Sequence, residues 1–190
     1  MVDEYQDELR RSLRAMPMVD PPSPWQLRTK YAVGGLTEIG YAPSSDLLLV
    51  VSSQGRGVFD CITGQRVARD RDDIWDDLNE TLLTSRGIGP LANLTIRLAG
   101  LHGGGLPMTT NDGWLLEVIP YDWPSHGLFI TSPSKPGQHG RENSFKIADD
   151  AATEFRAAGF SDTGQSFVFA TSSDLNIYMR NGGPENGHRH

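Results

Sequence analysis

Hydrophobic and polar positions in residues 40–69 predict three β-strands that follow one another through tight turns. Residues 47–51 form a continuous apolar run, which is typical of a strand covered on both faces. Residues 58–62 and 66–69 are two further strand-forming runs, and clusters of Ser, Gly, Asp and Thr separate the three. Strands joined by such short turns pair with their neighbours, so this segment predicts an antiparallel meander.

The same outline returns 119 residues later, at residues 159–180. Without any gap, Gly40 corresponds to Gly159, Leu49 to Val168 and Phe59 to Tyr178. Few positions are identical, but pattern, turn position and strand length agree together. The shared outline resembles a blade of a WD40-type β-propeller. It consists, in order, of an aromatic residue, a small residue, a turn, an apolar strand, a Ser/Thr turn and a second strand. The resemblance implies a propeller-like fold and no activity.

Shorter apolar runs predict further strands. Residues 94–98 alternate between apolar and polar, as a half-buried strand does. Residues 114–119 and 128–131 form a hairpin-like pair on either side of an aromatic-rich turn. Residues 132–143 contain two prolines and two glycines and predict an exposed loop. Residues 149–158 fit either a short helix or the lead-in to the last strands.

The N-terminal residues 2–16 predict an amphipathic helix, because apolar side chains recur at spacings of three and four. Those apolar positions are Val2, Tyr5, Leu9, Leu13 and Met16. Two roles stay open for this helix: it packs on its own domain, or it docks a partner. Residues 17–30 follow as a proline-rich connection, with a short strand predicted at residues 30–33.

A second helix is predicted at residues 72–84, where Ile74, Leu78 and Leu82 mark one face. This helix carries most of the acidic stretch at residues 70–80. Acids in its first turn stabilise the positive end of the helix dipole. The later acids form either a solvated face or a surface for a basic partner. Their spacing lacks the loop of an EF-hand, so no metal is expected there.

Together these elements predict a mainly β protein of antiparallel meander sheets, with an N-terminal helix and one acidic mid-chain helix. The sheets are propeller-like or form two packed layers. Residues 31–180 number 150, fewer than the about 160 that four blades of about 40 residues need, so a closed ring is not expected. The predicted organisation is one domain over residues 1–180, in which residues 31–180 form the β-rich body, and a disordered tail at residues 181–190.

Composition narrows the classes of partner. The chain has 190 residues and a formal net charge of −7, which argues against attraction to nucleic-acid phosphate and favours a basic protein. A single cysteine, Cys61, excludes an internal disulfide and fits a reducing compartment. The acidic N-terminus is not a secretory signal, and no apolar run approaches the ~20 residues of a membrane span. A cytoplasmic location without membrane contact is therefore expected.

The motifs that usually carry catalysis are missing or misplaced. There is no G-x-S-x-G elbow, and the S-x-x-K match at Ser132 and Lys135 falls in a proline-rich loop. Three consecutive glycines at residues 103–105 lack the Lys-Ser/Thr of a P-loop. The histidines have no paired cysteines, as most structural zinc sites require. We therefore predict no catalytic residues, no metal and no cofactor, and interpret Cys61 as a small buried hydrophobe.

The leading hypothesis is a non-enzymatic, acidic protein-binding module. Size, acidity and predicted location resemble those of the immunity or antitoxin proteins that neutralise bacterial toxins, which implies a basic protein partner. An acidic surface speeds association, and exposed aromatic side chains supply affinity. The predicted contact residues are Asp72, Asp73, Asp76, Asp77, Glu80 and Trp123.

Two alternatives stay open. In the first, the protein is a small enzyme or ligand-binding protein with a pocket near the loop between Gly103 and Gly105. The polar lining of that pocket is then Arg97, His102, Glu117 and His126. In the second, the chain is a scaffold that completes its sheet with a second copy, which makes it a homo-oligomer.

Overall fold

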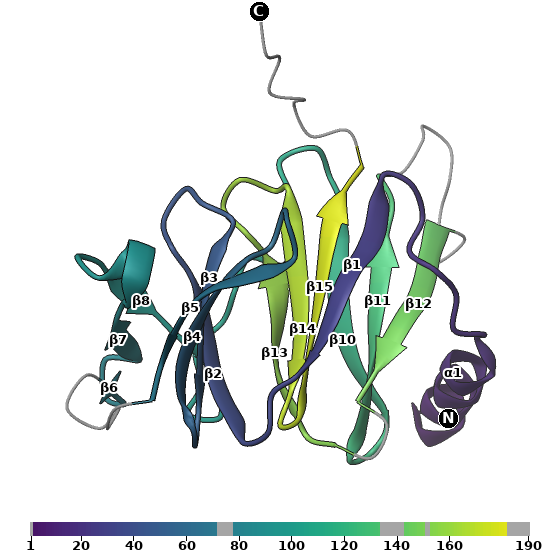
Figure 1. Cartoon of the computed structure of the whole chain (residues 1–190). Coiled ribbons are helices and arrows are strands. Elements are labelled where there is room, and N and C mark those ends of the chain that lie inside the picture. Colours follow the sequence, from purple (N-terminus) through teal and green to yellow (C-terminus); the bar gives the residue numbers. More distant parts are fainter. Residues whose placement is uncertain (1, 72–77, 134–142, 151–152, 182–190) are drawn as a thin grey trace, which may run out of the picture.

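The structure, a computed structural model, describes residues 2–71, 78–133, 143–150 and 153–181. These residues form one α-helix and four antiparallel sheets that lie in a row (Figure 1). The predictions of a mainly β fold, antiparallel meanders and an N-terminal helix are confirmed. Within the described ranges, no helix has the length and apolar character needed to cross a membrane.

The first sheet contains the predicted meander of residues 40–69. Its strands are β2 (Leu36–Tyr41), β3 (Leu47–Ser52), β4 (Gly55–Asp60), β5 (Gln65–Asp70) and β9 (Ala99–Gly100). Their order across the sheet is β5-β4-β3-β2-β9. Consecutive strands pair as neighbours because each connection is only a few residues long.

The second sheet repeats this meander. It consists of β13 (Phe155–Phe160), β14 (Ser166–Thr171), β15 (Asp174–Arg180) and β1 (Trp25–Ala32). Both β13 and β14 begin and end 119 residues after β2 and β3. The pairing register also repeats: Leu49 lies opposite Gly40 and Val58, and its counterpart Val168 lies opposite Gly159 and Ile177. The sequence repeat is therefore a repeat of sheet structure.

The N-terminal strand β1 occupies the edge of the second sheet, where β5 stands in the first. It pairs antiparallel with β15, the last of the described strands. The predicted connection of residues 17–30 is thus too long by six residues, because the strand begins at Trp25 and not at residue 30. Tertiary packing explains this: Trp25 is buried, and its ring lies 5.0 Å from Phe167 and 5.4 Å from Phe160.

Two more sheets flank this pair. The third sheet consists of β10 (Leu115–Asp122), β11 (Ser125–Thr131) and β12 (Ser144–Asp149), the last of which the sequence pattern did not predict. The small sheet consists of β6 (Leu78–Asn79), β7 (Thr84–Arg86) and β8 (Thr95–Arg97). A 3₁₀ turn, η1 (Gly89–Leu91), lies between β7 and β8.

Hydrophobic clusters between successive sheets hold the row together. In β3, Leu48 and Val50 pack against the second sheet, whereas Leu49 and Val51 pack against η1 and the small sheet. The far side of the second sheet packs on the third through a cluster that includes Phe160. Both faces of the first two sheets are thereby buried, which explains the continuous apolar run at residues 47–51.

Helix α1 (Val2–Ala15) closes the row at the third sheet. Its buried Leu13 packs with Tyr121 and Phe129, and the partly buried Leu9 and Met16 join the same cluster. Of the two roles left open for this helix, packing on its own domain is the one observed.

The predicted acidic helix at residues 72–84 is wrong over its described part, and residues 72–77 lie outside the described residues. From Leu78 onwards the chain forms β6, a turn and β7. The Asn79 side chain accepts a hydrogen bond from the backbone N–H of Leu82 at 2.8 Å, and Leu83 has a left-handed φ of 50°. This local side-chain bond competes with helical hydrogen bonding and fixes a turn.

Gly40 of β2, the counterpart of Gly159 in the repeat, provides a test of this packing. A Cβ atom at Gly40 would meet the carbonyl oxygen of Arg97 and lie 2.8 Å from Cγ2 of Ile96. We expect Gly40→Ala to lower the free energy of unfolding by about 1–3 kcal/mol, as overpacking does. Urea denaturation of the purified chain measures this change.

The matched control is Gly105→Ala, because a Cβ atom at Gly105 would have no heavy atom within 4 Å. This control should change the free energy of unfolding by less than about 0.5 kcal/mol. Equal effects of the two substitutions would contradict the packing described for β2.

Candidate functional site

One edge of the row is built from the turns that lie where β2 and β13 begin, along the lower side of Figure 1. We call this edge the turn rim. Backbone hydrogen bonds join its turns: Leu36 donates to Ser172, and Ser172 donates to Glu154. The turns of the rim are residues 33–35, 53–54, 80–83, 101–103, 123–124, 153–154 and 172–173. Segments that are far apart in sequence therefore present one continuous edge.

A histidine bound to a buried acid fixes the first of two key turns. Glu38 of β2 is only 1% exposed. Its Oε1 accepts the backbone N–H of His102 at 3.0 Å and lies 2.7 Å from Nδ1 of the same residue. On the other side of the ring, Nε2 lies 3.6 Å from a carboxylate oxygen of Glu80. His102 thus ties the loop after β9 to the first sheet and faces the turn between β6 and β7.

The same arrangement fixes the turn between β10 and β11. Asp150 is buried and accepts the backbone N–H of His126 at 2.9 Å, and its second oxygen lies 2.9 Å from Nδ1 of the ring. The imidazole also contacts two aromatic rings, with its centroid 5.4 Å from that of Phe155 and 6.0 Å from that of Trp123. This turn is therefore held by two hydrogen bonds and by aromatic contacts of the imidazole.

The predicted pocket residues Arg97, His102, Glu117 and His126 do not line any of the three hollows that the structure describes. The two histidines bond different carboxylates, one in the first sheet and one beside the third. Arg97 is an exposed residue of β8, and Glu117 lies in β10 opposite Phe129. The four predicted residues therefore do not form a common pocket lining among the described hollows.

Of the predicted contact residues, Asp72, Asp73, Asp76 and Asp77 lie outside the described residues. Glu80 and Trp123 are both on the turn rim, and the Trp123 side chain is 80% exposed. Leu82, which the prediction placed on the apolar face of a helix, lies in the β6–β7 turn and is 68% exposed. The β6–β7 turn directs this side chain outwards.

Cys61 lies in the hydrophobic cluster between the first two sheets, next to a buried polar network. The Asp46 carboxylate accepts hydrogen bonds from Ser161 at 2.7 Å and from Ser166 at 2.6 Å, and Tyr41 lies 3.2 Å from the Ser166 hydroxyl. Burial raises the pKa of the Cys61 thiol to about 12. The interpretation of Cys61 as a buried hydrophobe is confirmed, since the residue is 0% exposed.

No group of three His, Cys, Asp or Glu side chains gathers in the described residues to hold a metal ion. Burial also raises the pKa of the Tyr41 and Tyr178 hydroxyls. The sequence reasoning missed the acids Glu38 and Asp150, which lie 64 and 24 residues from the histidines they bind. Their burial in strands and loops depends on the folded structure and leaves no local spacing signal.

No family model and no curated protein matches the chain. The function therefore has to be argued from the geometry of the turn rim and of the hollows.

The high pKa of Cys61 predicts a slow reaction with alkylating reagents. At about pH 8 the native thiol should react with iodoacetamide about a thousandfold more slowly than the same thiol in unfolded protein, because an exposed cysteine has a pKa near 8.5. Mass spectrometry of quenched time points, in buffer and in concentrated urea, measures both rates. Labelling of the native chain at the rate of a free thiol would show that Cys61 is accessible and reactive.

Proposed function

We propose that the protein is a non-enzymatic binding module that captures a basic protein on its turn rim, as an immunity or antitoxin protein does. One observation carries the proposal. The two most exposed large hydrophobic side chains among the described residues, Trp123 and Leu82, both stand on this rim.

The exposure of Trp123 fits the role of an interface anchor. Tryptophan is enriched among the residues that dominate binding energy, because it buries a large area and has few rotatable bonds. The turn that carries it is fixed by the hydrogen bonds between His126 and Asp150. An anchor on a rigid turn loses little conformational entropy on binding, so more of its contact energy appears as affinity.

Charge beside Leu82 favours a basic partner. Glu80 precedes it by two residues, and its side chain is 49% exposed. The sequence before this turn is rich in aspartate, and the whole chain has a net charge of −7. An acidic surface of this kind attracts a basic protein over a distance set by ionic strength and raises the association rate. A cytoplasmic location is part of the proposal, since the single cysteine fits a reducing compartment.

The proposal predicts that the partner is lost when the anchors are removed. Trp123→Ala combined with Leu82→Ser should weaken binding of the basic partner at least about thirtyfold, because hot-spot truncations cost about 2 kcal/mol or more. The partner is first recovered from a lysate of the source cells at low salt and identified by mass spectrometry. Its affinity for the purified variants is then measured by calorimetry.

Leu94→Ser is the matched control, because Leu94 is an exposed leucine, at 42%, in the connection between η1 and β8, outside the turns of the rim. This variant should bind the partner as the unchanged chain does. Association should also slow as salt is added, since the charges are screened. Recovery of only acidic proteins, or an unchanged affinity in the double variant, would refute the proposal, and recovery of a second copy of the chain would point to self-assembly.

A further inference from the structure

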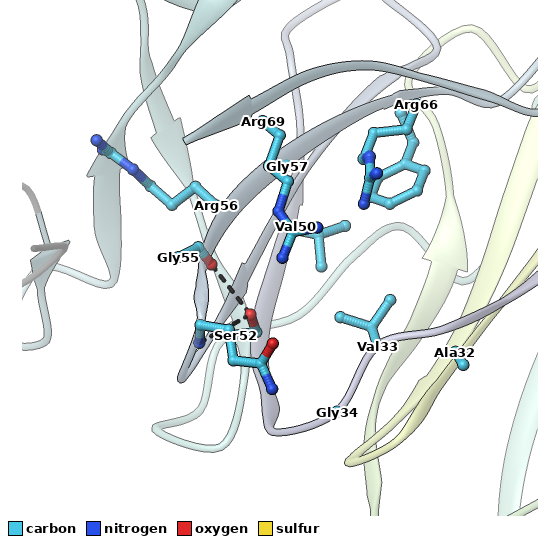
Figure 2. Close-up of a pocket in the computed structure, with 12 residues that line it drawn as sticks. Ala32, Val33, Gly34, Val50, Ser52, Gly55, Arg56, Gly57, Arg66 and Arg69 are labelled. Carbon is cyan, nitrogen blue, oxygen red and sulfur yellow. Dashed lines mark hydrogen bonds between the residues drawn. The ribbon is translucent and has the colours of Figure 1, made fainter. Parts of the chain in front are cut away.

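A hollow of about 200 Å³ lies between the first sheet and the chain that connects β1 to β2 (Figure 2). Its apolar lining includes Val33, Val50 and Phe59, and Gly57 also lines it. A Cβ atom at Gly57 would lie 3.2 Å from the Phe59 ring and 3.5 Å from Cδ of Arg66. The missing side chain at Gly57 is therefore part of what keeps the hollow open.

Two arginines of β5, Arg66 and Arg69, extend into this hollow in Figure 2. Arg56 also lines it, but its guanidinium turns away and bonds the Asp70 carboxylate at 2.7 Å and the Arg86 carbonyl at 2.9 Å. By contrast, neither Arg66 nor Arg69 forms a side-chain hydrogen bond or ion pair within the described part of the chain. None of the twelve residues that line the hollow is acidic.

The positive charges at this place repel one another. The pKa of the Arg69 guanidinium is lowered, chiefly by the charge of Arg71 and in smaller part by the charge of Arg66. Two exposed arginines that have no side-chain partner among the described residues thus line one small hollow, in a chain with a net charge of −7. An anion placed between the guanidinium groups would offset this repulsion.

We propose that this hollow binds a phosphate group, either free or on a small phosphomonoester, between the guanidinium groups of Arg66 and Arg69. Guanidinium forks match the oxygens of phosphate with paired hydrogen bonds. A phosphomonoester carries a charge of about −1.5 to −2 at neutral pH, so it balances two arginines better than a carboxylate does. The hollow is smaller than the roughly 300 Å³ at which pockets for drug-sized ligands begin, which limits the ester to a short organic part.

A purely structural role for the same arginines makes a different prediction. β5 is the edge strand of the first sheet, and charged residues on an edge strand keep it from pairing with other chains. In that role Arg66 and Arg69 bind no ligand, and their replacement promotes self-association. The two roles are therefore distinguished by a direct binding measurement.

The experiment titrates the purified full chain with inorganic phosphate, glycerol 3-phosphate and acetate, by calorimetry at constant ionic strength. Phosphate or its ester should bind with saturation, and acetate at least about tenfold more weakly, since it carries one charge. Arg66→Ala and Arg69→Ala should each weaken phosphate binding about tenfold or more, because each removes charge-assisted hydrogen bonds. Tighter binding of the ester than of free phosphate identifies the ester as the better ligand and assigns a contribution to the apolar lining.

Arg10→Ala is the matched control, because it removes an exposed cation of α1, at the far end of the row. It should leave phosphate binding unchanged, and melting curves should show that all three variants fold. Binding should also strengthen from about pH 5 to about pH 7.5, as the phosphate loses its second proton near pH 6.

Several results would overturn the proposal: no saturable binding of either phosphate compound, equal binding by the arginine variants, or acetate binding as tight as phosphate binding. These outcomes are independent of the proposed function, because Trp123 and Leu82 do not line this hollow.

Discussion

Leu49 and Val50 are neighbours in β3, and each is buried beneath a different sheet. Successive side chains of a strand point to opposite faces, so an uninterrupted apolar strand requires a cover on both sides. This requirement sets the architecture. The first two sheets each need two neighbours, and the row then has to end in elements with one polar face. Helix α1 and the small sheet are those two ends, and each supplies an apolar side inwards.

The pairing of β1 with β15 adds a second constraint to this row. It joins the N-terminal part of the chain to its last strand, so that the second sheet is complete only when both are present. Trp25 anchors this junction through Phe160 and Phe167, and the Arg180 guanidinium lies 4.6 Å from the centre of its ring. Arg180 is further fixed by two hydrogen bonds to Asp112, of 2.7 and 2.8 Å, which reach the segment before the third sheet. The most distant segments of the chain thus stabilise one another in the middle of the row.

The sequence pattern predicted those elements whose side chains follow a simple period. The continuous apolar run at residues 47–51, the strand pattern that repeats after 119 residues and the helical spacing of residues 2–16 can each be read from neighbouring positions in the sequence, and all three appear in the structure. The resemblance of the repeat to a WD40-type propeller blade stays a prediction. The second sheet shares the outline and register of the first, and its fourth strand comes from the N-terminal part of the chain.

What the pattern could not predict depends on contacts between distant residues. Trp25 begins a strand because a buried aromatic cluster receives it, although the preceding prolines suggest an irregular connection. Residues 78–84 have the apolar spacing of a helix. The backbone N–H of Leu82 instead donates a hydrogen bond to the Asn79 side chain, which stabilises a turn. The candidate site is less predictable still. Glu38 meets His102 only because β9 pairs with β2, and Arg66 and Arg69 share a hollow only because Gly57 leaves room beside them.

The two candidate sites draw on residues that the core does not need. His102 on the turn rim and His126 at the start of β11 each contact a buried acid through Nδ1, and so they position the turns beside them. Trp123 and Leu82 on the same rim are exposed to solvent. Arg66 and Arg69 lie on β5, the edge strand of the first sheet, and among the described strands only β4 pairs with β5. A scaffold of buried sheets with rigid, exposed turns can hold a partner without rearranging, since little conformational entropy is lost when fixed groups bind. Among the described residues, Cys61 is buried with a raised pKa, and His102 and His126 each hold a turn through an Nδ1 contact with a buried carboxylate.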